Sequence, residues 1–250
     1  MLRVLDLFSG IGGFSLGLER TGGFETVAFC EIEPFPRRVL AKHWPEVPCY
    51  EDVRKLTGDI LARDGIAVDV ITGGFPCQDL SVAGKQRGMG EGTRSGLWSE
   101  IVRLIGELRP RYVIVENVAA LLSGPSQKRG GWFGRVLGDL AECGYDAEWQ
   151  CINPKDVGLK LSRPRVWVCA YPKEKHVAQV VDQAGLSPEH RRMGAEHISR
   201  TGWSVDQRRM GRGIDGLPDE TYRFECLGNA VVPQIPELIG RAILAAEARK

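Results

Sequence analysis

One of the seven cysteines of this chain stands where a nucleophile is useful. An apolar run, Val68–Thr72, predicts a buried strand, and the turn-like sequence GGFPC follows it and ends at Cys77. Cys77 is therefore expected beyond the carboxyl end of a strand, beside the crevice where open α/β sheets bind ligands. Cysteine is the strongest intrinsic nucleophile among the side chains, although little of it is thiolate at neutral pH. A small apolar core residue is the alternative on this evidence alone.

A carboxyl group is predicted at the same edge of the sheet. The apolar run Tyr112–Val115 predicts another strand, and Glu116 follows it directly. Exclusion of water from such a site would raise the pKa of the Glu116 carboxyl and make it a proton donor. Taken by itself, Glu116 is equally compatible with an acidic residue at a helix N-terminus.

A glycine-rich loop near the N-terminus could hold a cofactor. The sequence SGIGG, Ser9–Gly13, follows the apolar run Arg3–Phe8 and precedes a helical pattern that begins at Phe14. Glycines in this position let a ligand approach the backbone and the helix N-terminus, and Glu31 stands about 20 residues later, where nucleotide folds place a ribose-binding carboxylate. The G-x-G-G spacing is not a dinucleotide fingerprint, so we expect an adenosine-bearing ligand other than a nicotinamide cofactor. A plain glycine turn with a solvated Glu31 is the alternative.

The elements that would position these residues alternate along most of the chain. Continuous apolar runs predict strands, and apolar residues at i, i+3, i+4 and i+7 predict helices between them. This order predicts an α/β fold with a doubly wound parallel sheet covered on both faces. The predicted strands are Arg3–Phe8, Thr26–Cys30, Val68–Thr72, Tyr112–Val115 and Arg165–Ala170, and the clearest helices cover Trp98–Leu108, Trp132–Leu140 and Ile235–Ile243.

Two segments outside this alternation carry local positive charge. The stretch Ser81–Gly96 contains five glycines and three cations, which would suit a loop that closes over a polyanion, although a long flexible loop is the simpler alternative. The stretch from Leu186 to Gly213 contains six arginines and only three acidic residues. The chain as a whole has 33 Lys and Arg against 32 Asp and Glu, a net charge of +1, so any contact with a polyanion must be local.

Composition excludes several classes of protein. With 250 residues and 43% hydrophobic content the chain can bury a full core, so it is neither disordered, nor collagen-like, nor a coiled coil. The cysteines form no C-x-x-C pair, which indicates reduced thiols and no metal site. No apolar run has the length of a signal peptide or a membrane span, so we expect a cytoplasmic protein without a membrane partner.

Five short motifs occur in a fixed order along the chain. They are DLFSGIGGF (6–14), GGFPCQDLS (73–81), ENV (116–118), SRPR (162–165) and GNAVVPQIPELIG (228–240). Together they resemble the motifs of the DNA (cytosine-5-)-methyltransferases, in particular the small single-chain bacterial or phage type. The second motif resembles the catalytic-cysteine motif of that family, the third its glutamate motif and the fourth its arginine motif.

The resemblance implies a Rossmann-like methyltransferase sheet that binds S-adenosylmethionine, releases S-adenosylhomocysteine and needs no metal. By that resemblance Glu31 contacts the ribose, Ile32 the adenine ring and Asp52 the adenine edge. The implied cofactor-binding residues are Phe8, Ser9, Gly10, Ile11, Gly12, Gly13, Glu31, Ile32, Asp52, Val53, Gly74, Pro76, Asn229 and Val231.

The resemblance also implies transfer of a methyl group to C5 of a flipped-out cytosine in double-stranded DNA. Cys77 would add covalently to C6, Glu116 would donate a proton to N3, and Arg165 together with Arg163 would stabilise the ring near O2. Flipping costs a few kcal/mol, which contacts to the DNA must offset. The candidate DNA-binding residues are Gln78, Ser81, Lys85, Gln86, Arg87, Arg94, Arg208, Arg209 and Arg212.

Three regions follow from this assignment. Residues 1–171 are the expected catalytic domain, residues 172–226 a small irregular target-recognition segment, and residues 227–250 a motif and helix that pack back on the catalytic domain. The variable stretch Pro172–Glu225 has 54 residues, which is short for reading a DNA sequence. We therefore expect a short or loosely defined recognition sequence.

The chain departs from the family pattern around its arginine motif. The family usually has glutamine where Leu161 stands, and Pro164 between the two arginines is unusual. A polar contact that orders the site is thus either lost or supplied by another residue. The motif expected just before residue 228 is degenerate and keeps only Arg223.

Two alternatives of different kinds remain. A transfer RNA cytosine-5 methyltransferase would use the same mechanism, so the catalytic residues do not exclude it. A catalytically silent DNA- or cofactor-binding module is motivated by Leu161 and by the short recognition segment. We expect a monomer whose partner is double-stranded DNA, with a cognate restriction endonuclease in the same system.

Overall fold

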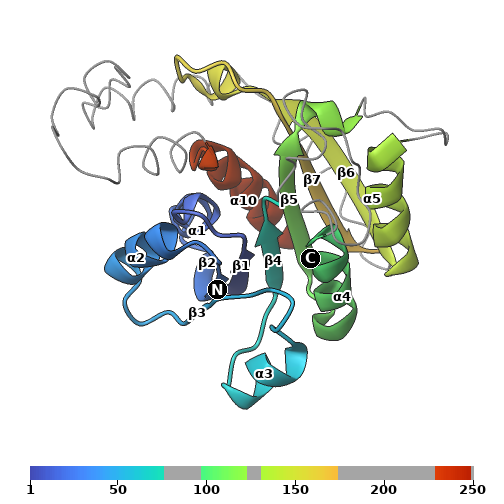
Figure 1. The fold of residues 1–250 in the computed structure, drawn as a ribbon. Helices are drawn as coiled ribbons and strands as arrows, with labels where there is room; N and C mark the ends of the chain where they lie inside the picture. The colour runs from blue at the N-terminus through green and yellow to red at the C-terminus, as the bar shows by residue number, and fades with distance from the viewer. Residues whose placement is uncertain (76–96, 123–130, 174–228, 249–250) are drawn as a thin grey trace, which may run out of the picture.

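A seven-stranded sheet forms the centre of the protein. The structure is a computed structural model that describes residues 1–75, 97–122, 131–173 and 229–248, and Figure 1 shows the sheet with helices on either side. The strand order is β3-β2-β1-β4-β5-β7-β6. The strands are β1 (Leu2–Leu7), β2 (Phe24–Cys30), β3 (Cys49–Tyr50), β4 (Val70–Gly73), β5 (Tyr112–Val118), β6 (Tyr145–Ile152) and β7 (Arg165–Pro172).

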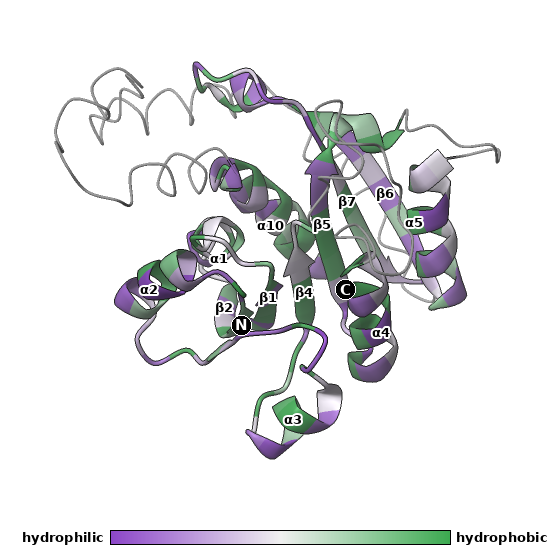
Figure 2. Ribbon diagram, in the orientation of Figure 1, coloured by the Kyte–Doolittle hydropathy of each residue, from purple (hydrophilic) through white to green (hydrophobic). Residues whose placement is uncertain are grey.

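Helices cover both faces of this sheet, as predicted. One hydrophobic cluster joins β1, β4 and β5 to α4 and α5, and a second joins the opposite face to α1 and α10. Figure 2 shows the central strands as mostly hydrophobic ribbons between the helices. The helices are α1 (Gly13–Glu19), α2 (Pro34–His43), α3 (Gly58–Arg63), α4 (Trp98–Leu108), α5 (Gly131–Glu142) and α10 (Gln234–Glu247), with short 3₁₀ turns η2 (Ala119–Leu122) and η3 (Pro154–Val157).

The sheet is mixed, so the prediction of an all-parallel sheet is wrong at one edge. Strands β1 to β5 pair in parallel, but β7 lies between β5 and β6 and is antiparallel to both. The connection from β6 to β7 contains only the turn η3 and no crossover helix, so β7 runs back beside β6. This return brings Arg165 opposite Val118 and Trp167 opposite Glu116.

Strand β6 is not predicted by the sequence pattern, because it contains no continuous apolar run. Its sequence YDAEWQCI mixes polar with apolar residues, and its interior residues are partly or fully exposed because β6 is the edge of the sheet. A half-exposed edge strand carries no continuous apolar run, although one side of β6 packs against α5. The two-residue strand β3 is too short to carry any pattern.

Candidate active site

The glycine-rich loop follows β1 in an unusual backbone conformation. Phe8, Gly10 and Gly12 have φ angles of 52°, 53° and 84°, which is the left-handed region. The Ser9 hydroxyl donates to the Asp6 carbonyl at 2.5 Å, and its oxygen accepts from the Cys30 amide at 3.3 Å, so the loop is tied to the ends of β1 and β2. A left-handed Phe8 costs free energy that such ties must offset, and strained positions of this kind gather at ligand sites.

Glu31 is the acidic residue that contacts the backbone of the glycine-rich loop. Its carboxylate is 8% exposed and accepts the Gly10 amide at 2.7 Å and the Glu33 amide at 2.8 Å. Burial raises the pKa of Glu31, and these two backbone hydrogen bonds oppose the rise. An ionised carboxylate has about four acceptor positions, so the Gly10 and Glu33 amides leave acceptor capacity for a hydroxyl donor of a ligand.

The surroundings of this loop fit an adenosine-bearing cofactor. An added Cβ at Gly10 would meet no atom within 4 Å, so space is open at the centre of the loop. Ile32 is 53% exposed directly after Glu31 and offers an apolar surface. Asp52 is oriented by its hydrogen bonds from Arg54, which lower its pKa, while the side chain of Val53 is buried in the core.

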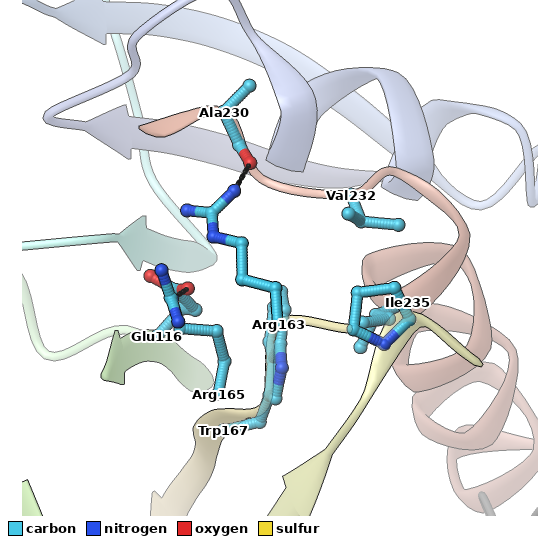
Figure 3. Close-up of a pocket in the computed structure, with 8 residues that line it drawn as sticks. Glu116, Arg163, Arg165, Trp167, Ala230, Val232 and Ile235 are labelled. Atoms are coloured by element: carbon cyan, nitrogen blue, oxygen red, sulfur yellow. Dashed lines mark hydrogen bonds and ion pairs between the residues drawn. The ribbon is translucent and has the colours of Figure 1, made fainter. Parts of the chain in front are cut away.

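The C-terminal segment lies against the start of α1. A Cβ at Gly13 would stand 2.4 Å from the Val231 carbonyl oxygen, so only glycine allows this approach. Arg163 reaches the same segment and donates from Nη1 to the Ala230 carbonyl at 2.7 Å, as Figure 3 shows. The arginine motif and the C-terminal motif are therefore joined directly.

Glu116, which is buried, and two partly buried arginines lie together beside that segment (Figure 3). Arg165 Nε lies 3.0 Å from Glu116 Oε1, and the Glu116 side chain is 11% exposed. Burial raises the pKa of Glu116, while the charges of Arg165 and Arg163 oppose the rise. Glu116 therefore keeps its proton to higher pH than an ordinary glutamate and can donate it to a base nitrogen.

A pocket opens next to this charged group. The pocket is small and partly open to solvent. Arg163 Nε and Trp167 Nε1 are buried without a hydrogen-bond partner in the part of the chain that the structure describes. The pocket is lined by Glu116, Pro154, Arg163, Arg165, Trp167, Ala230, Val232 and Ile235.

The described residues before Cys77 are held against Glu116. A Cβ at Gly74 would stand 3.3 Å from Glu116 Oε2, and Asn117 donates from Nδ2 to the Phe75 carbonyl at 3.1 Å. The Phe75 ring packs on Trp98 with 5.3 Å between centroids. Because Trp98 begins α4, both ends of the stretch between residues 75 and 98 are anchored at one place on the sheet.

The profile of the C-5 cytosine-specific DNA methylases matches residues 2–209. This chain belongs to that family. It is 34% identical over 196 residues to the Type II methyltransferase M.Sau3AI of Staphylococcus aureus, covering 74% of this chain and 47% of that protein. It is 31% identical over 225 residues to the Type II methyltransferase M2.BsuMI of Bacillus subtilis, covering 87% of this chain and 55% of that protein.

The fold agrees with solved methyltransferase structures. The match to a candidate DNA modification methyltransferase encoded within an E. coli prophage has a TM-score of 0.57 and 28% identity, over 70% of this chain and 47% of that chain. The Rossmann-like methyltransferase sheet implied by the motifs is thereby confirmed. The chain spans about half the length of the relatives it matches.

Several predicted residues of this C-5 cytosine-specific DNA methylase family member lie outside the described residues. They are Pro76, Cys77, Gln78, Ser81, Lys85, Gln86, Arg87, Arg94, Arg208, Arg209 and Arg212, together with the recognition segment from residue 174 to residue 226. The remaining predicted residues fall into two groups, the glycine loop with Glu31 and the Glu116 group with its arginines. Gly13 with Val231 joins the C-terminal segment to the first group, and Arg163 with Ala230 joins it to the second.

Asn153 contacts the arginine motif and was not singled out by the sequence analysis. Its side-chain oxygen accepts the Arg163 amide at 3.3 Å, and its Nδ2 donates to Ser162 Oγ at 3.3 Å. Asn153 also caps the turn η3 in a capping box with Asp156. It therefore supplies polar support to the arginine motif, in which Leu161 replaces the usual glutamine. The signal in the sequence was the NPKD turn, since an Asn followed three residues later by Asp is typical of an N-cap.

The described residues contain neither a candidate membrane-spanning helix nor a group of side chains suited to bind a metal ion. No helix in the described ranges is long and apolar enough to cross a membrane. Within the same ranges no three His, Cys, Asp or Glu side chains are grouped as metal ligands would be.

Replacing Gly13 by alanine is expected to disturb the packing of α1 against the C-terminal segment. The new Cβ would press on the Val231 carbonyl at 2.4 Å, so α1 and the C-terminal segment must separate. We expect a loss of about 1–3 kcal/mol in the free energy of unfolding, as for overpacked cores. Urea denaturation measures this change. Gly106→Ala is the matched control, since an added Cβ there meets no atom within 4 Å, and helix propensity predicts a gain of up to about 1 kcal/mol. Equal stability of the two variants would contradict the packing argument.

The stability of the protein is expected to fall as pH rises from about 4 to about 7 through the titration of Asp6. Burial raises the pKa of Asp6 from 3.8 to about 7, so the native state retains a proton that the unfolded chain releases. The contribution is at most about 4 kcal/mol, and Glu31 and Glu116, whose pKa values are also raised, add slopes of the same sign. Urea denaturation of wild type and Asp6→Asn across this range isolates the Asp6 part. Parallel pH profiles for the two proteins would show that Asp6 titrates normally.

Proposed function

We propose that this protein transfers a methyl group from S-adenosylmethionine to C5 of cytosine in double-stranded DNA. The observation that carries the proposal is the buried Glu116, paired with Arg165 and approached by the main chain at Gly74, three residues before Cys77. Membership of the C-5 cytosine-specific DNA methylase family supports DNA as the substrate.

S-adenosylmethionine supplies an electrophilic methyl group on its sulfonium. Glu31 would accept hydrogen bonds from the ribose hydroxyls with the acceptor positions that Gly10 and Glu33 leave free. The exposed Ile32 would cover the adenine ring. The amides of the glycine loop and the segment from Asn229 to Val231 would hold the amino-acid end, with Asp52 near the adenine.

The chain's own residues would make cytosine C5 nucleophilic. The Cys77 thiolate forms a bond to C6 while the Glu116 carboxyl gives its proton to N3, so that the electron pair of the C5–C6 double bond becomes available at C5. Arg165 keeps Glu116 in place and, with Arg163, stabilises charge on O2. After C5 has taken the methyl group, loss of its proton to solvent re-forms the double bond and expels Cys77, and the N3 proton returns to Glu116.

The cytosine must leave the duplex to reach these groups, because C5 and C6 are stacked inside it. We assign the contacts that offset this cost to the stretch Ser81–Gly96, with Lys85, Arg87 and Arg94, and to the segment 172–226, with Arg208, Arg209 and Arg212. The relatives are named Type II methyltransferases, which supports a cognate restriction endonuclease as a partner. The protein itself is proposed to act as a monomer.

Transfer of labelled methyl groups tests the proposal. Purified protein is incubated with labelled S-adenosylmethionine and either unmethylated duplex DNA or transfer RNA, and bisulfite sequencing of the DNA product locates the modified carbon and its sequence context. We expect label in DNA at cytosine C5 within a short or degenerate context. Label in transfer RNA alone would support the RNA alternative, and binding without any transfer would support the silent module.

A further inference from the structure

We propose that Asp6 is a positioning residue that sets the distance between the cofactor loop and the segment leading to Cys77; this inference rests on the proposed function. The Asp6 side chain is fully buried near the end of β1. Its Oδ2 accepts the Ser15 hydroxyl of α1 at 2.9 Å, and its Oδ1 accepts the Thr72 hydroxyl of β4 at 2.7 Å. One carboxyl group therefore contacts both the helix that follows the glycine loop and the strand that leads toward Cys77.

The Ser15 bond and the Asp6 carbonyl act on the cofactor side. Ser15 lies in the first turn of α1, directly after the glycine loop, and the carbonyl of Asp6 accepts the Ser9 hydroxyl at the other end of that loop. Asp6 thus contacts the loop before and after its glycines. Movement of Asp6 would change the position of the amides that face the cofactor.

The Thr72 bond acts on the nucleophile side. Thr72 pairs with Asp6 in the parallel ladder of β1 and β4 and is also fully buried. Two residues later Gly74 lies against the Glu116 carboxylate, and Asn117 holds the Phe75 carbonyl. Asp6 therefore holds β4 through Thr72, and Glu116 and Asn117 of β5 contact the residues that directly follow β4.

Burying a carboxyl group only to fill space in the core would cost free energy of folding. An apolar side chain of similar size in this place would avoid the desolvation penalty, and hydrogen bonds to two hydroxyl groups recover only part of it. Directional bonds, in contrast, hold the distances between three elements, which apolar contacts do with less precision. Fixed distances between these elements are what a methyl transfer requires, because the nucleophile, the base and the methyl donor must be aligned.

The two bonds can be broken separately. Ser15→Ala removes the bond on the cofactor side, and Thr72→Val removes the bond on the nucleophile side with nearly unchanged shape. Thr72→Ser retains the hydroxyl and is the conservative rescue. Thr57→Ala is the control for stability alone, because it removes the N-cap of α3 and costs about 1 kcal/mol away from the site.

Calorimetric S-adenosylmethionine binding and the kcat of DNA methylation are measured for each variant. We expect Ser15→Ala to raise the cofactor Kd about tenfold with kcat nearly unchanged at saturating cofactor, which is the size of effect of one hydrogen bond. We expect Thr72→Val to lower kcat about tenfold or more with little change in Kd, and Thr72→Ser to restore most of it.

Other outcomes overturn the proposal or the function separately. Changes no larger than those of Thr57→Ala, or equal changes of Kd and kcat in both variants, would make Asp6 a structural residue only. A wild-type protein that binds S-adenosylmethionine and methylates no DNA would instead overturn the proposed function and with it the Thr72 half, while the Ser15 half would still be decided by the cofactor Kd.

Discussion

Cys77→Ala is expected to abolish methyl transfer while leaving cofactor binding intact. Without the sulfur atom no bond to C6 can form, and C5 of an intact cytosine ring is a poor nucleophile. Removal of a catalytic nucleophile costs on the order of 10⁴-fold to 10⁶-fold in kcat. The measurement is the rate of label transfer from S-adenosylmethionine to duplex DNA under saturating conditions.

A second assay follows the covalent bond itself. In the presence of S-adenosylmethionine, duplex DNA in which 5-fluorocytosine replaces cytosine should become linked to the wild-type protein, because after methyl transfer fluorine at C5 cannot leave as the proton does and Cys77 is then not expelled. The complex should survive denaturing electrophoresis with wild type and with Cys143→Ala, and it should be absent with Cys77→Ala. Cys143 is a free cysteine that directly follows the C-terminal end of α5. A linked complex formed by Cys77→Ala would assign the nucleophile to another residue.

Glu116→Gln is expected to slow methyl transfer by about 10² to 10⁴, the usual contribution of a positioned general acid. The amide keeps the shape of the side chain but has no acidic proton for N3, and it loses the ion pair with Arg165 at 3.0 Å. Cofactor affinity should change by less than about threefold, since the proposed contact of Glu116 is with the base and not with the sulfonium.

The matched control is Glu25→Gln, which makes the same chemical change on an exposed position of β2. Its methylation rate and cofactor affinity should equal those of wild type. A Glu116→Gln variant that loses cofactor binding and methylation in parallel would mean that Glu116 supports the cofactor site or the fold, and that the proton for N3 comes from another group.

The motifs and the central strands could be predicted from the sequence because both depend on local information. The buried parallel strands β1, β2, β4 and β5 are short segments of mostly apolar residues, and α4 and α10 show regular apolar spacing. Strand β6 could not be predicted in this way, since an edge strand exposes part of its side chains. The reversed direction of β7 depends on its neighbours, which a pattern within one strand does not contain.

The amino-acid sequence by itself determined which residues are available for the proposed chemistry, namely Cys77, Glu116, Arg165 and the glycines of the loop, and the order of the elements that carry them. The tertiary structure decided how the charged groups meet. Only the antiparallel return of β7 places Arg165 against Glu116, and only the approach of the C-terminal segment pairs Arg163 with Ala230. It also brought Asp6 to Ser15 and Thr72 across three elements. The physical reason is that burial, ion pairing and pKa shifts depend on distances between segments far apart in the chain, and these distances exist only after the core has packed.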